Sequence, residues 1–181
     1  MGTNKALLPI EGKANIQLIK EQLTPYFSQI MIATNDFEAY AFLGLPMIKD
    51  EYEGLGPMAG IHAGLKNSKT ETNFFVACDM PFASGELVKH LVDLSEEYEA
   101  VVPRINGKLH PLFSVFKKTI LPKIEQCLLG ENLRMSDLLS TLEVRYVNEI
   151  ELANVISGNI EKIFYNMNSP LDYQKVIRQN L

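Results

Sequence analysis

The stretch Phe74-Phe-Val-Ala-Cys-Asp-Met-Pro81 decides the fold, because it marks where a strand ends and a helix is about to begin. Its first five residues are all apolar, which is the pattern of a strand covered on both faces. Asp79 ends this run, and Pro81 turns the chain away. Ser84 can then cap a helix whose apolar side chains share one face, at Leu87, Leu91 and Leu94. The stretch therefore predicts a buried strand, a turn and a helix that packs on a sheet.

The same alternation of strand and helix patterns continues on both sides of this unit. Apolar runs typical of strands lie at 30–33, 46–49, 100–103 and 112–116, and helical spacing occupies 16–27, 119–129 and 135–142. Ser169-Pro170 opens a last helix, and Asn106-Gly107 is typical of a hairpin that introduces one antiparallel strand. Strands that alternate with helices predict βαβ units. We expect a three-layer α/β/α sandwich around a Rossmann-like, mostly parallel sheet with one antiparallel strand.

The composition narrows the class of protein. The 181 residues are 46% hydrophobic and 22% charged, which is ordinary for one globular domain. The net charge is −5 and no run of cations is longer than Lys117-Lys118, so nucleic acid is not an expected partner. No apolar run approaches the roughly 20 residues that span a bilayer, so no membrane is expected either. We expect Cys78 and Cys127, which lie far apart in the sequence, to be reduced and partly buried in a cytoplasmic protein.

Asp79 is the clearest candidate for a functional residue, because ligands of such folds bind beyond the carboxyl ends of the strands. A carboxylate at this place can hold Mg²⁺ with one or two oxygens, while water and phosphates complete the octahedron. The same carboxylate can instead cap the turn that leads to the helix near Ser84. The residues alone leave both interpretations open.

A second candidate lies where Asp50 ends the run at 46–49 and the glycine-rich segment 54–64 follows. Backbone N–H groups at the start of a helix in this segment can bind a phosphate or a ring. The segment also resembles a loosened dinucleotide fingerprint, but its glycine spacing is too long and Pro57 lacks an N–H where a pyrophosphate needs one. Alternatively, Gly60 and Gly64 let the helix pack closely on the sheet, which is compatible with a binding role.

Three further sets of polar residues can contact a ligand. Lys5 precedes an apolar run, and His110 follows the predicted hairpin. Asn166 and Asn168 point to the same side of an extended segment. Each set also has an ordinary explanation, as a solvated lysine, a packed histidine and a turn before Ser-Pro. The histidines lack the spacing of zinc ligands, and Cys127 has no partner for thiol catalysis in the sequence.

Six motifs, taken together and in this order, resemble those of the molybdenum cofactor guanylyltransferases over essentially the whole chain. The motifs are Asn4-Lys-Ala-Leu-Leu8, Asn35 after a strand, Asp50 with Gly56-Pro-Met-Ala-Gly60, Cys78-Asp-Met-Pro81, His110-Pro111 and Asn166-Met-Asn-Ser-Pro170. The resemblance implies a single nucleotidyltransferase domain over residues 1–181, with the fold of the nucleotide-diphospho-sugar transferases.

The resemblance implies an enzyme that transfers GMP from Mg-GTP to the phosphate of molybdopterin and releases pyrophosphate. It gives the catalytic roles to Lys5, on the nucleotide phosphates, and to Asp79, which carries the Mg²⁺ cofactor. The attacking phosphate oxygen is already anionic at neutral pH, so no general base is required. The implied protein partners are other cofactor-biosynthesis proteins and the acceptor molybdoenzymes.

The remaining implied contacts divide between the nucleotide and the second substrate. The resemblance assigns the nucleotide to Lys5, Asn35, Asp50, Gly56 and Asp79. It assigns the molybdopterin side to His110, Asn166 and Asn168, with the two asparagines towards the pterin or the metal. Ala33 stands where the family often has an asparagine, so one base contact is expected to be lost.

The chain departs from the family at its beginning. Family members open with a strand and the loop Leu-Ala-Gly-Gly, followed by Arg-Met-Gly and the lysine, whereas here Met1-Gly2 coincides with the end of that loop. We therefore expect an N-terminally incomplete domain that lacks a central strand. Two strand edges would keep unpaired backbone groups, so we expect marginal stability or self-association.

Two enzyme activities and one binding role remain as alternatives. The enzyme alternatives are a molybdopterin cytidylyltransferase and a sugar-1-phosphate nucleotidyltransferase, which differ from the first interpretation in the triphosphate or acceptor bound. The binding alternative is a non-catalytic module that keeps the pterin or nucleotide but transfers nothing. The segment Gly56-Pro-Met-Ala-Gly-Ile61 favours guanine over cytosine by its resemblance to the guanylyl branch.

Overall fold

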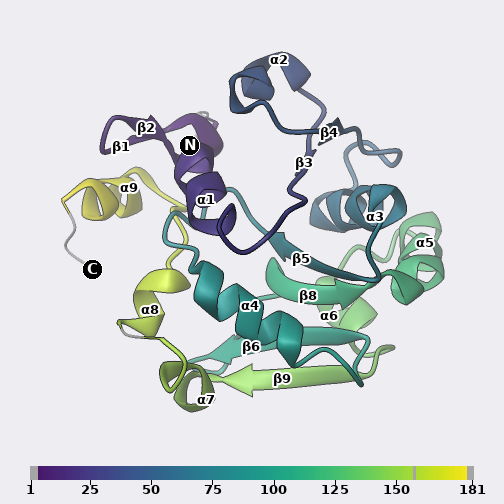
Figure 1. Cartoon of the computed structure of the whole chain (residues 1–181). Coiled ribbons are helices and arrows are strands. Elements are labelled where there is room, and N and C mark those ends of the chain that lie inside the picture. The colour runs from purple at the N-terminus through teal and green to yellow at the C-terminus, as the bar shows by residue number, and fades with distance from the viewer. Residues whose placement is uncertain (1–3, 157, 179–181) are drawn as a thin grey trace.

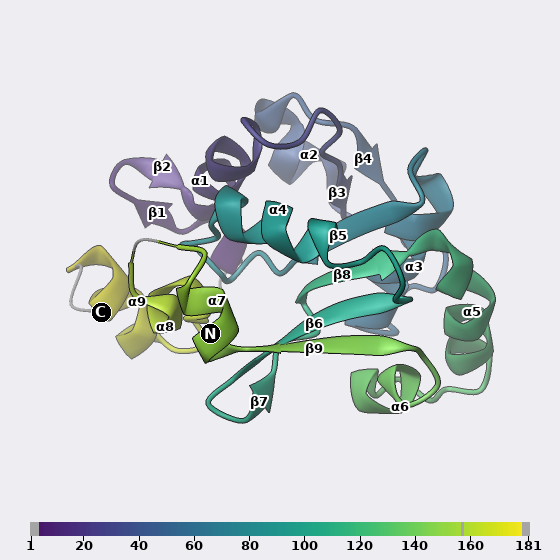
Figure 2. The same ribbon diagram turned by 60° about the horizontal axis from the view of Figure 1, so that its bottom comes forward.

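A mixed five-stranded sheet forms the centre of the computed structural model, which describes residues 4–156 and 158–178 of the chain. Its strands lie side by side in the order β5, β8, β6 and β9 (Figure 2). The short strand β7 pairs with the last two residues of β6, Arg104 and Ile105. The strands are β5 (Thr72–Val76), β6 (Ala100–Ile105), β7 (Lys108–Leu109), β8 (Phe113–Lys117) and β9 (Val144–Asn148). Met1 and Gly2, where the end of the family loop was expected, lie outside the described residues.

Three of the five strands share one direction, which agrees with a mostly parallel sheet, but two strands, β7 and β8, run antiparallel to them where one was expected. β8 runs antiparallel to both of its neighbours, β5 and β6, so these two share one direction, and β9 pairs with β6 in parallel. The predicted hairpin joins β6 to β7 through Asn106 and Gly107, whose φ angles are 50° and 76°. Two successive residues with positive φ match the right-handed twist of the strands, and an Asn-Gly pair tolerates that conformation.

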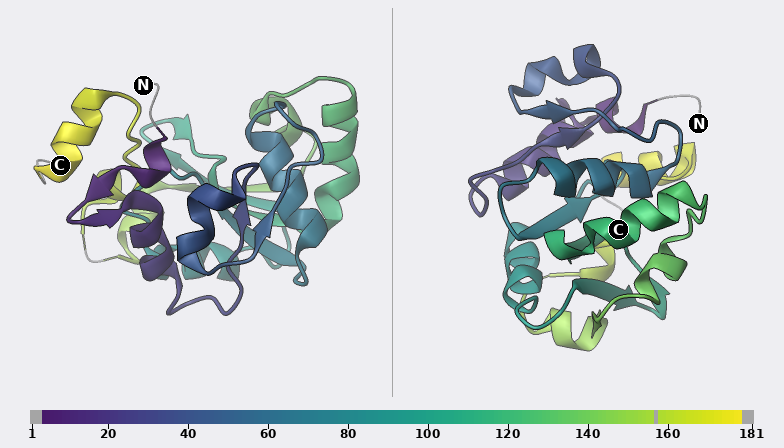
Figure 3. Two further views of the ribbon diagram at one scale, coloured as in Figure 1. Left: turned by 90° about the horizontal axis from the view of Figure 1, so that it is seen from above. Right: turned by 90° about the vertical axis from the view of Figure 1, so that its right-hand side faces the viewer.

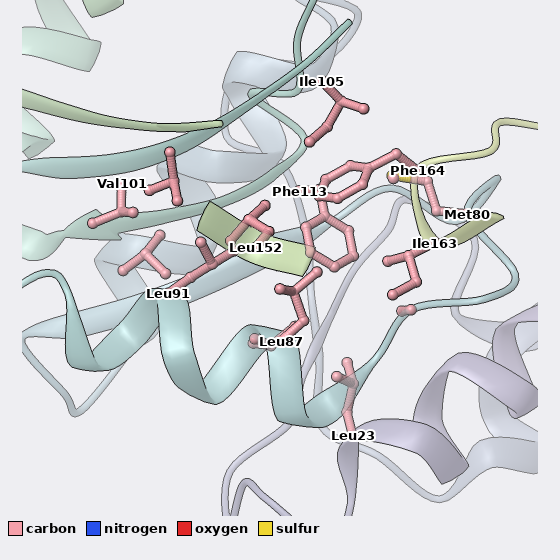
Figure 4. Close-up of a cluster of buried hydrophobic side chains, with 14 of the residues drawn as sticks. Leu23, Met80, Leu87, Leu91, Val101, Ile105, Phe113, Leu152, Ile163 and Phe164 are labelled. Carbon is pink, nitrogen blue, oxygen red and sulfur yellow. The ribbon is translucent and has the colours of Figure 1, made fainter. Parts of the chain in front are cut away.

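Helices cover both faces of this sheet, as the three-layer prediction requires (Figure 1). Leu87 and Leu91 of α4 (Gly85–Asp93) point at Val101 and Phe113 of the sheet, and all four are fully buried (Figure 4). The same cluster takes side chains from α1 (Asn15–Leu23), α7 (Glu149–Ala153) and α8 (Ile160–Ile163). Ser84 caps α4 as predicted, since its Oγ accepts a hydrogen bond from the Leu87 N–H at 3.3 Å.

The opposite face carries α3 (Pro57–Asn67), α5 (Leu121–Leu129) and α6 (Met135–Leu139). α3 and α5, blue and green in Figure 3, lie next to each other there. Ala100 and Val102 of β6 point to this second cluster while Val101 points to the first. This alternation along one fully apolar strand is what a sheet buried on both faces requires.

Two short strands stand apart from the central sheet (Figure 1). β3 (Ile32–Ala33) and β4 (Met47–Ile48) form a parallel pair of their own, near α3. α2 (Phe37–Tyr40) lies between them in the sequence. Within the described residues β3 pairs on one side only, and so does β5, which agrees with the expectation of two unpaired strand edges.

The remaining elements complete the N- and C-terminal parts of the chain. A single 3-10 turn, η1 (Lys5–Leu7), leads into a small antiparallel pair, β1 (Pro9–Ile10) and β2 (Lys13–Ala14). The last helix, α9 (Pro170–Ile177), begins at the predicted proline with Ser169 as its cap. No helix of the described residues is long and apolar enough to cross a bilayer.

Several sequence expectations were wrong in detail. The helix predicted over 16–27 ends at Leu23, and the one over 135–142 ends at Leu139. β9 was not predicted at all, and neither were α2, α7 and α8. Cys78, expected to be partly buried, is an exposed free thiol, whereas Cys127 is free and partly buried as expected.

Candidate active site

Lys5 and Asp79 meet at the carboxyl end of β5, where the sequence placed a functional carboxylate. The Lys5 Nζ donates a hydrogen bond to the Asn168 Oδ1 at 3.0 Å and lies 3.5 Å from the Asp79 Oδ2. The two charged side chains remain partly accessible, with 27% and 18% exposed. Three residues far apart in the sequence thus form one polar cluster, which a ligand can still reach.

The backbone around Asp79 is held by contacts from two other elements. The Asp79 carbonyl accepts a hydrogen bond from the Met167 N–H at 3.0 Å. Next to it, the Cys78 carbonyl accepts one from the Nδ2 of Asn15 at 2.6 Å. Asn15 is the first residue of α1 and is fully buried. These bonds fix the main chain that carries the Asp79 carboxylate, whose Oδ2 faces Lys5 while its Oδ1 has no hydrogen-bond partner.

Asn15 is a residue that the sequence reasoning missed. It occupies the same helix face as the buried Ile19 and Leu23, four and eight residues further on. A polar side chain on the buried face of an amphipathic helix needs a hydrogen-bond partner inside the protein. An asparagine at a position where the helical spacing predicts an apolar residue was therefore the signal in the sequence that could have identified Asn15.

Asn168 is held by the cap of α9. The Asp172 Oδ2 accepts hydrogen bonds from the N–H groups of Asn168 and Ser169, at 3.1 and 2.8 Å. The Ser169 hydroxyl, together with these bonds, lowers the pKa of the Asp172 carboxyl. The reciprocal bond from the Asp172 N–H to the Ser169 Oγ completes a capping box. A local capping motif therefore places the asparagine that holds Lys5.

Two side-chain oxygens, one of Asp79 and one of Asn166 in the segment that contacts Asp79, are of the kind that a hard cation binds. The Asp79 Oδ1 and the Asn166 Oδ1 are both buried and have no hydrogen-bond partner. Buried polar atoms of this kind need an explanation, and an ion is one of the ordinary ones. Over residues 4–156 and 158–178, no group of three or more His, Cys, Asp or Glu side chains is arranged to hold a metal. One carboxylate and one amide match Mg²⁺, which takes few protein ligands and keeps water and phosphate oxygens.

A second polar group lies at the ends of β3 and β4. The Asn35 Oδ1 accepts a hydrogen bond from the Asp50 N–H at 3.2 Å. The Asp50 Oδ1 is buried without a hydrogen-bond partner, and burial raises the pKa of this carboxyl above its ordinary value. Gly56, with φ at 73°, precedes α3, whose first residue is Pro57. The three predicted nucleotide contacts on this side, at Asn35, Asp50 and Gly56, thus surround the start of one helix.

A cavity of about 630 Å³ lies between β3 and β5, and it is lined by neighbours of the two polar groups rather than by the groups themselves. Its lining includes Ala33 and Ile48 on one side and Ala77 and Cys78 on the other. The structure therefore brings the ends of three strands to one region, as the general rule for ligand sites in such folds predicts.

His110 packs on an aromatic ring of the segment that leads to Asn166. Its ring packs on Phe164, with the ring centroids 4.8 Å apart, and burial lowers its pKa to about 4. No hydrogen bond or ion pair joins its ring to Lys5 or Asp79 in the part of the chain that the structure describes. Phe164 precedes Asn166 by two residues, so His110 contacts that segment, and its predicted contact with substrate stays a prediction.

The comparisons with known proteins agree with this architecture. A family model described as the MobA-like NTP transferase domain matches residues 1–145. A probable molybdenum cofactor guanylyltransferase from Carboxydothermus hydrogenoformans is 33% identical over 98% of this chain and 89% of its own length. A protein with the same name from Pelotomaculum thermopropionicum is 35% identical over 97% of this chain and 84% of its own length.

Solved structures show the same fold. The molybdopterin-guanine dinucleotide biosynthesis protein A from Archaeoglobus fulgidus superposes with a TM-score of 0.84 at 24% identity, over 99% of this chain and 91% of that one. The 2-C-methyl-D-erythritol 4-phosphate cytidylyltransferase from Thermus thermophilus superposes with a TM-score of 0.73 at 15% identity, over 98% of this chain and 94% of that one. With relatives above 30% identity over nearly its whole length and a family model over most of it, the chain belongs to the MobA-like NTP transferase family and is a nucleotidyltransferase.

Proposed function

We propose that the protein transfers GMP from Mg-GTP to molybdopterin, which yields the guanine dinucleotide cofactor and pyrophosphate. The observation that carries the proposal is the Lys5 ammonium group, which contacts Asn168 and Asp79, together with the buried Asp79 Oδ1, which lacks a hydrogen-bond partner. The names of the relatives support the same substrates, since they are probable molybdenum cofactor guanylyltransferases.

The reaction places specific demands on the chain. A phosphate oxygen of molybdopterin forms a bond to the α-phosphorus of GTP, and the bond from that phosphorus to the bridging oxygen breaks as pyrophosphate leaves. Two anions must be brought together, so positive charge and alignment matter more than proton transfer. Lys5 supplies a cation whose position is set by two partners. His110, with its low pKa, stays neutral at physiological pH and is not needed as a base.

Asp79 and Asn166 are the residues that would hold Mg²⁺, through their unpartnered oxygens. When bound, the cation neutralises charge on the nucleotide phosphates. The hydrogen bonds from Met167 and Asn15 to the backbone around Asp79 keep the carboxylate preorganised for this role.

Asp50 is the residue that would select guanine. Guanine has N–H donors on its ring edge and amino group, and a carboxylate accepts two hydrogen bonds at once. The Asp50 Oδ1 is buried and free of partners, while the Asn35 amide oxygen holds its backbone. The raised pKa of Asp50 means that this contact weakens on acidification sooner than for an ordinary aspartate.

The proposal is tested by pyrophosphate release in the presence of Mg²⁺, GTP and molybdopterin. Asp79→Asn removes one anionic ligand with little change of shape, and we expect the rate to fall by at least about 100-fold. Asp93→Asn is the matched control, because the Asp93 carboxylate is 58% exposed and pairs with Lys89, one turn earlier in α4. Its rate should stay unchanged. An Asp79→Asn protein with full activity would refute the assignment of the metal.

The same assay with CTP separates the alternatives. Release with GTP alone supports the proposal, and release with CTP alone would replace it with a cytidylyltransferase. Calorimetric binding of molybdopterin without pyrophosphate release from either nucleotide would replace it with a binding module. Release with a sugar 1-phosphate in place of molybdopterin would point to the remaining enzyme alternative.

A further inference from the structure

His62 is a fully buried histidine that the reaction described above does not use. It lies in α3 and faces α5, the helix beside it (Figure 3). Its Nε2 donates a hydrogen bond to the Glu125 Oε1 of α5 at 3.2 Å, since a carboxylate only accepts. Its Nδ1 is buried and has no hydrogen-bond partner. An unpaired buried nitrogen lowers stability, so the packing of the core does not explain why a histidine stands here.

The His62 ring also contacts the loop that leads from β4 to α3. The Tyr52 ring meets it edge to face, with the ring centroids 5.0 Å apart and the ring planes at 83°. Pairs of this geometry are stabilising beyond the area that they bury. Tyr52 and Leu55 pack on the cluster beneath α3 and α5, whereas Glu51 and Glu53 are exposed. The contact with His62 is therefore one of the few that attach this loop to the protein core.

An ion pair ties the same loop to the same face of α3. The Lys66 Nζ lies 2.6 Å from the Glu51 Oε2, and Lys66 follows His62 by one helical turn. Lys66 lowers the pKa of the Glu51 carboxyl, and Glu51 raises the pKa of Lys66, so both stay charged at neutral pH. Both side chains are about half exposed, and solvent and salt weaken such a pair. The ring contact is thus the more robust of the two attachments.

The loop held in this way joins two of the proposed nucleotide contacts. Asp50 precedes residues 51–55, and Gly56 follows them. The Leu55 N–H donates to the Tyr52 carbonyl at 3.3 Å, which closes a turn inside the loop. Gly54 and Gly56 have φ angles of 78° and 73°, and glycine leaves the backbone free to change conformation. A displacement of Tyr52 therefore moves the main chain between the two contacts.

We propose that His62 is a positioning residue for nucleotide binding, which holds Tyr52 and thereby fixes the loop between Asp50 and Gly56. Glu125 orients the His62 ring through its hydrogen bond with Nε2, and the edge-to-face contact passes that orientation to Tyr52. Holding the loop in one conformation before the nucleotide arrives reduces the entropy that binding costs. The inference rests on the proposed function, because it takes Asp50 and Gly56 as contacts of GTP.

Steady-state kinetics of pyrophosphate release test this role. In His62→Gln the amide can still donate to Glu125, but no ring faces Tyr52. We expect the KM for GTP to rise at least about fivefold, with kcat and the KM for molybdopterin nearly unchanged, because only the hold on the nucleotide loop is lost. His90→Gln is the matched control, since His90 of α4, on the other face of the sheet, also has a buried ring nitrogen without a partner. Its KM for GTP should equal that of the unmodified protein.

Tyr52, which is only partly buried, provides a second pair of variants. Tyr52→Phe keeps the ring and should leave the KM for GTP unchanged, whereas Tyr52→Ala should raise it as His62→Gln does. Since His62 acts through Tyr52, the double variant should raise the KM no further than Tyr52→Ala alone. Independent, multiplicative effects of the two substitutions would overturn the proposal.

Urea unfolding and hydrogen exchange distinguish positioning from a purely structural role. A His62→Gln protein that unfolds at lower urea but keeps its KM for GTP would overturn the proposal. Without nucleotide, we expect faster exchange of the backbone amides at 51–56 in His62→Gln and Tyr52→Ala, and unchanged exchange in His90→Gln. Equal exchange in all three variants would also overturn it. Failure of the proposed function has a different signature: the unmodified protein would then release no pyrophosphate from GTP, which would overturn both.

Discussion

At the scale of single residues, the hydrogen bonds around Asp79 hold the main chain and leave side-chain oxygens without partners. Asn15 and Met167 bind backbone carbonyls, whereas the Asp79 Oδ1 and the Asn166 Oδ1 bind nothing in the protein. A group whose backbone is fixed and whose side-chain oxygen is free is ready to bind a ligand without reorganisation. Such preorganisation costs stability in the free protein, since buried unpaired oxygens are unfavourable.

His110 gives a prediction on pH dependence. Burial lowers its pKa from 6.5 to about 4, so between these values the unfolded chain binds a proton that the folded protein does not. The free energy of unfolding therefore falls as the pH drops from about 6.5 to about 4. His110→Phe keeps a ring against Phe164 and removes the titration.

Urea unfolding at several pH values across this range measures the effect. We expect the slope of unfolding free energy against pH to be smaller for His110→Phe, by at most one proton. All other titrating groups are common to both proteins, so the difference isolates His110. Equal slopes would show that the ring is not buried in its neutral form.

At the scale of elements, α3 packs on the sheet through one of its two candidate glycines. A Cβ added to Gly64 would lie 2.5 Å from the Cε1 of Phe75, whose ring also packs on Phe116. A Cβ added to Gly60 would find ordinary contact with the Ala33 Cβ at 3.8 Å. The sequence interpretation that both glycines permit close packing was therefore right for Gly64 and wrong for Gly60.

The two glycines make a matched pair of variants. Gly64→Ala should lower the free energy of unfolding by about 1–2 kcal/mol, because overpacking outweighs the gain in helix propensity. Gly60→Ala should raise it by up to about 1 kcal/mol, since alanine favours the helix and has room. Chemical denaturation of both variants checks this. A stabilised Gly64→Ala protein would mean that Phe75 moves aside freely.

At the scale of the whole molecule, the unpaired edges of β3 and β5 set the stability of the fold. Their backbone groups and the apolar cavity between them contribute little to the free energy of unfolding compared with a continuous sheet. The two helix layers still pack on both faces of the sheet formed by β5, β6, β8 and β9.

We therefore expect a melting temperature below the about 45–65 °C that is typical of mesophile domains, or concentration-dependent self-association. Differential scanning calorimetry and sedimentation velocity at several protein concentrations measure both. A cooperative transition within that range from a monodisperse monomer would contradict this expectation.

Local features of the fold could be predicted from the sequence because they depend on neighbours within a few residues. Ser84 and Ser169 cap their helices by bonding N–H groups three positions ahead, and Asn106-Gly107 forms a turn by its own backbone preference. The apolar runs predicted the layers for a similar reason, since a strand without polar positions must be covered on both faces.

The sequence alone thus determined the layers, the caps, the hairpin and, through the order of six motifs, the family. Tertiary structure decided what depends on distant segments: the meeting of Lys5 with Asp79 and Asn168, the pairing of β9 with β6, and the burial of Asn15. It also decided that Cys78 is exposed. Spacing along the chain encodes local geometry, whereas contacts between distant residues exist only once the chain has closed on itself.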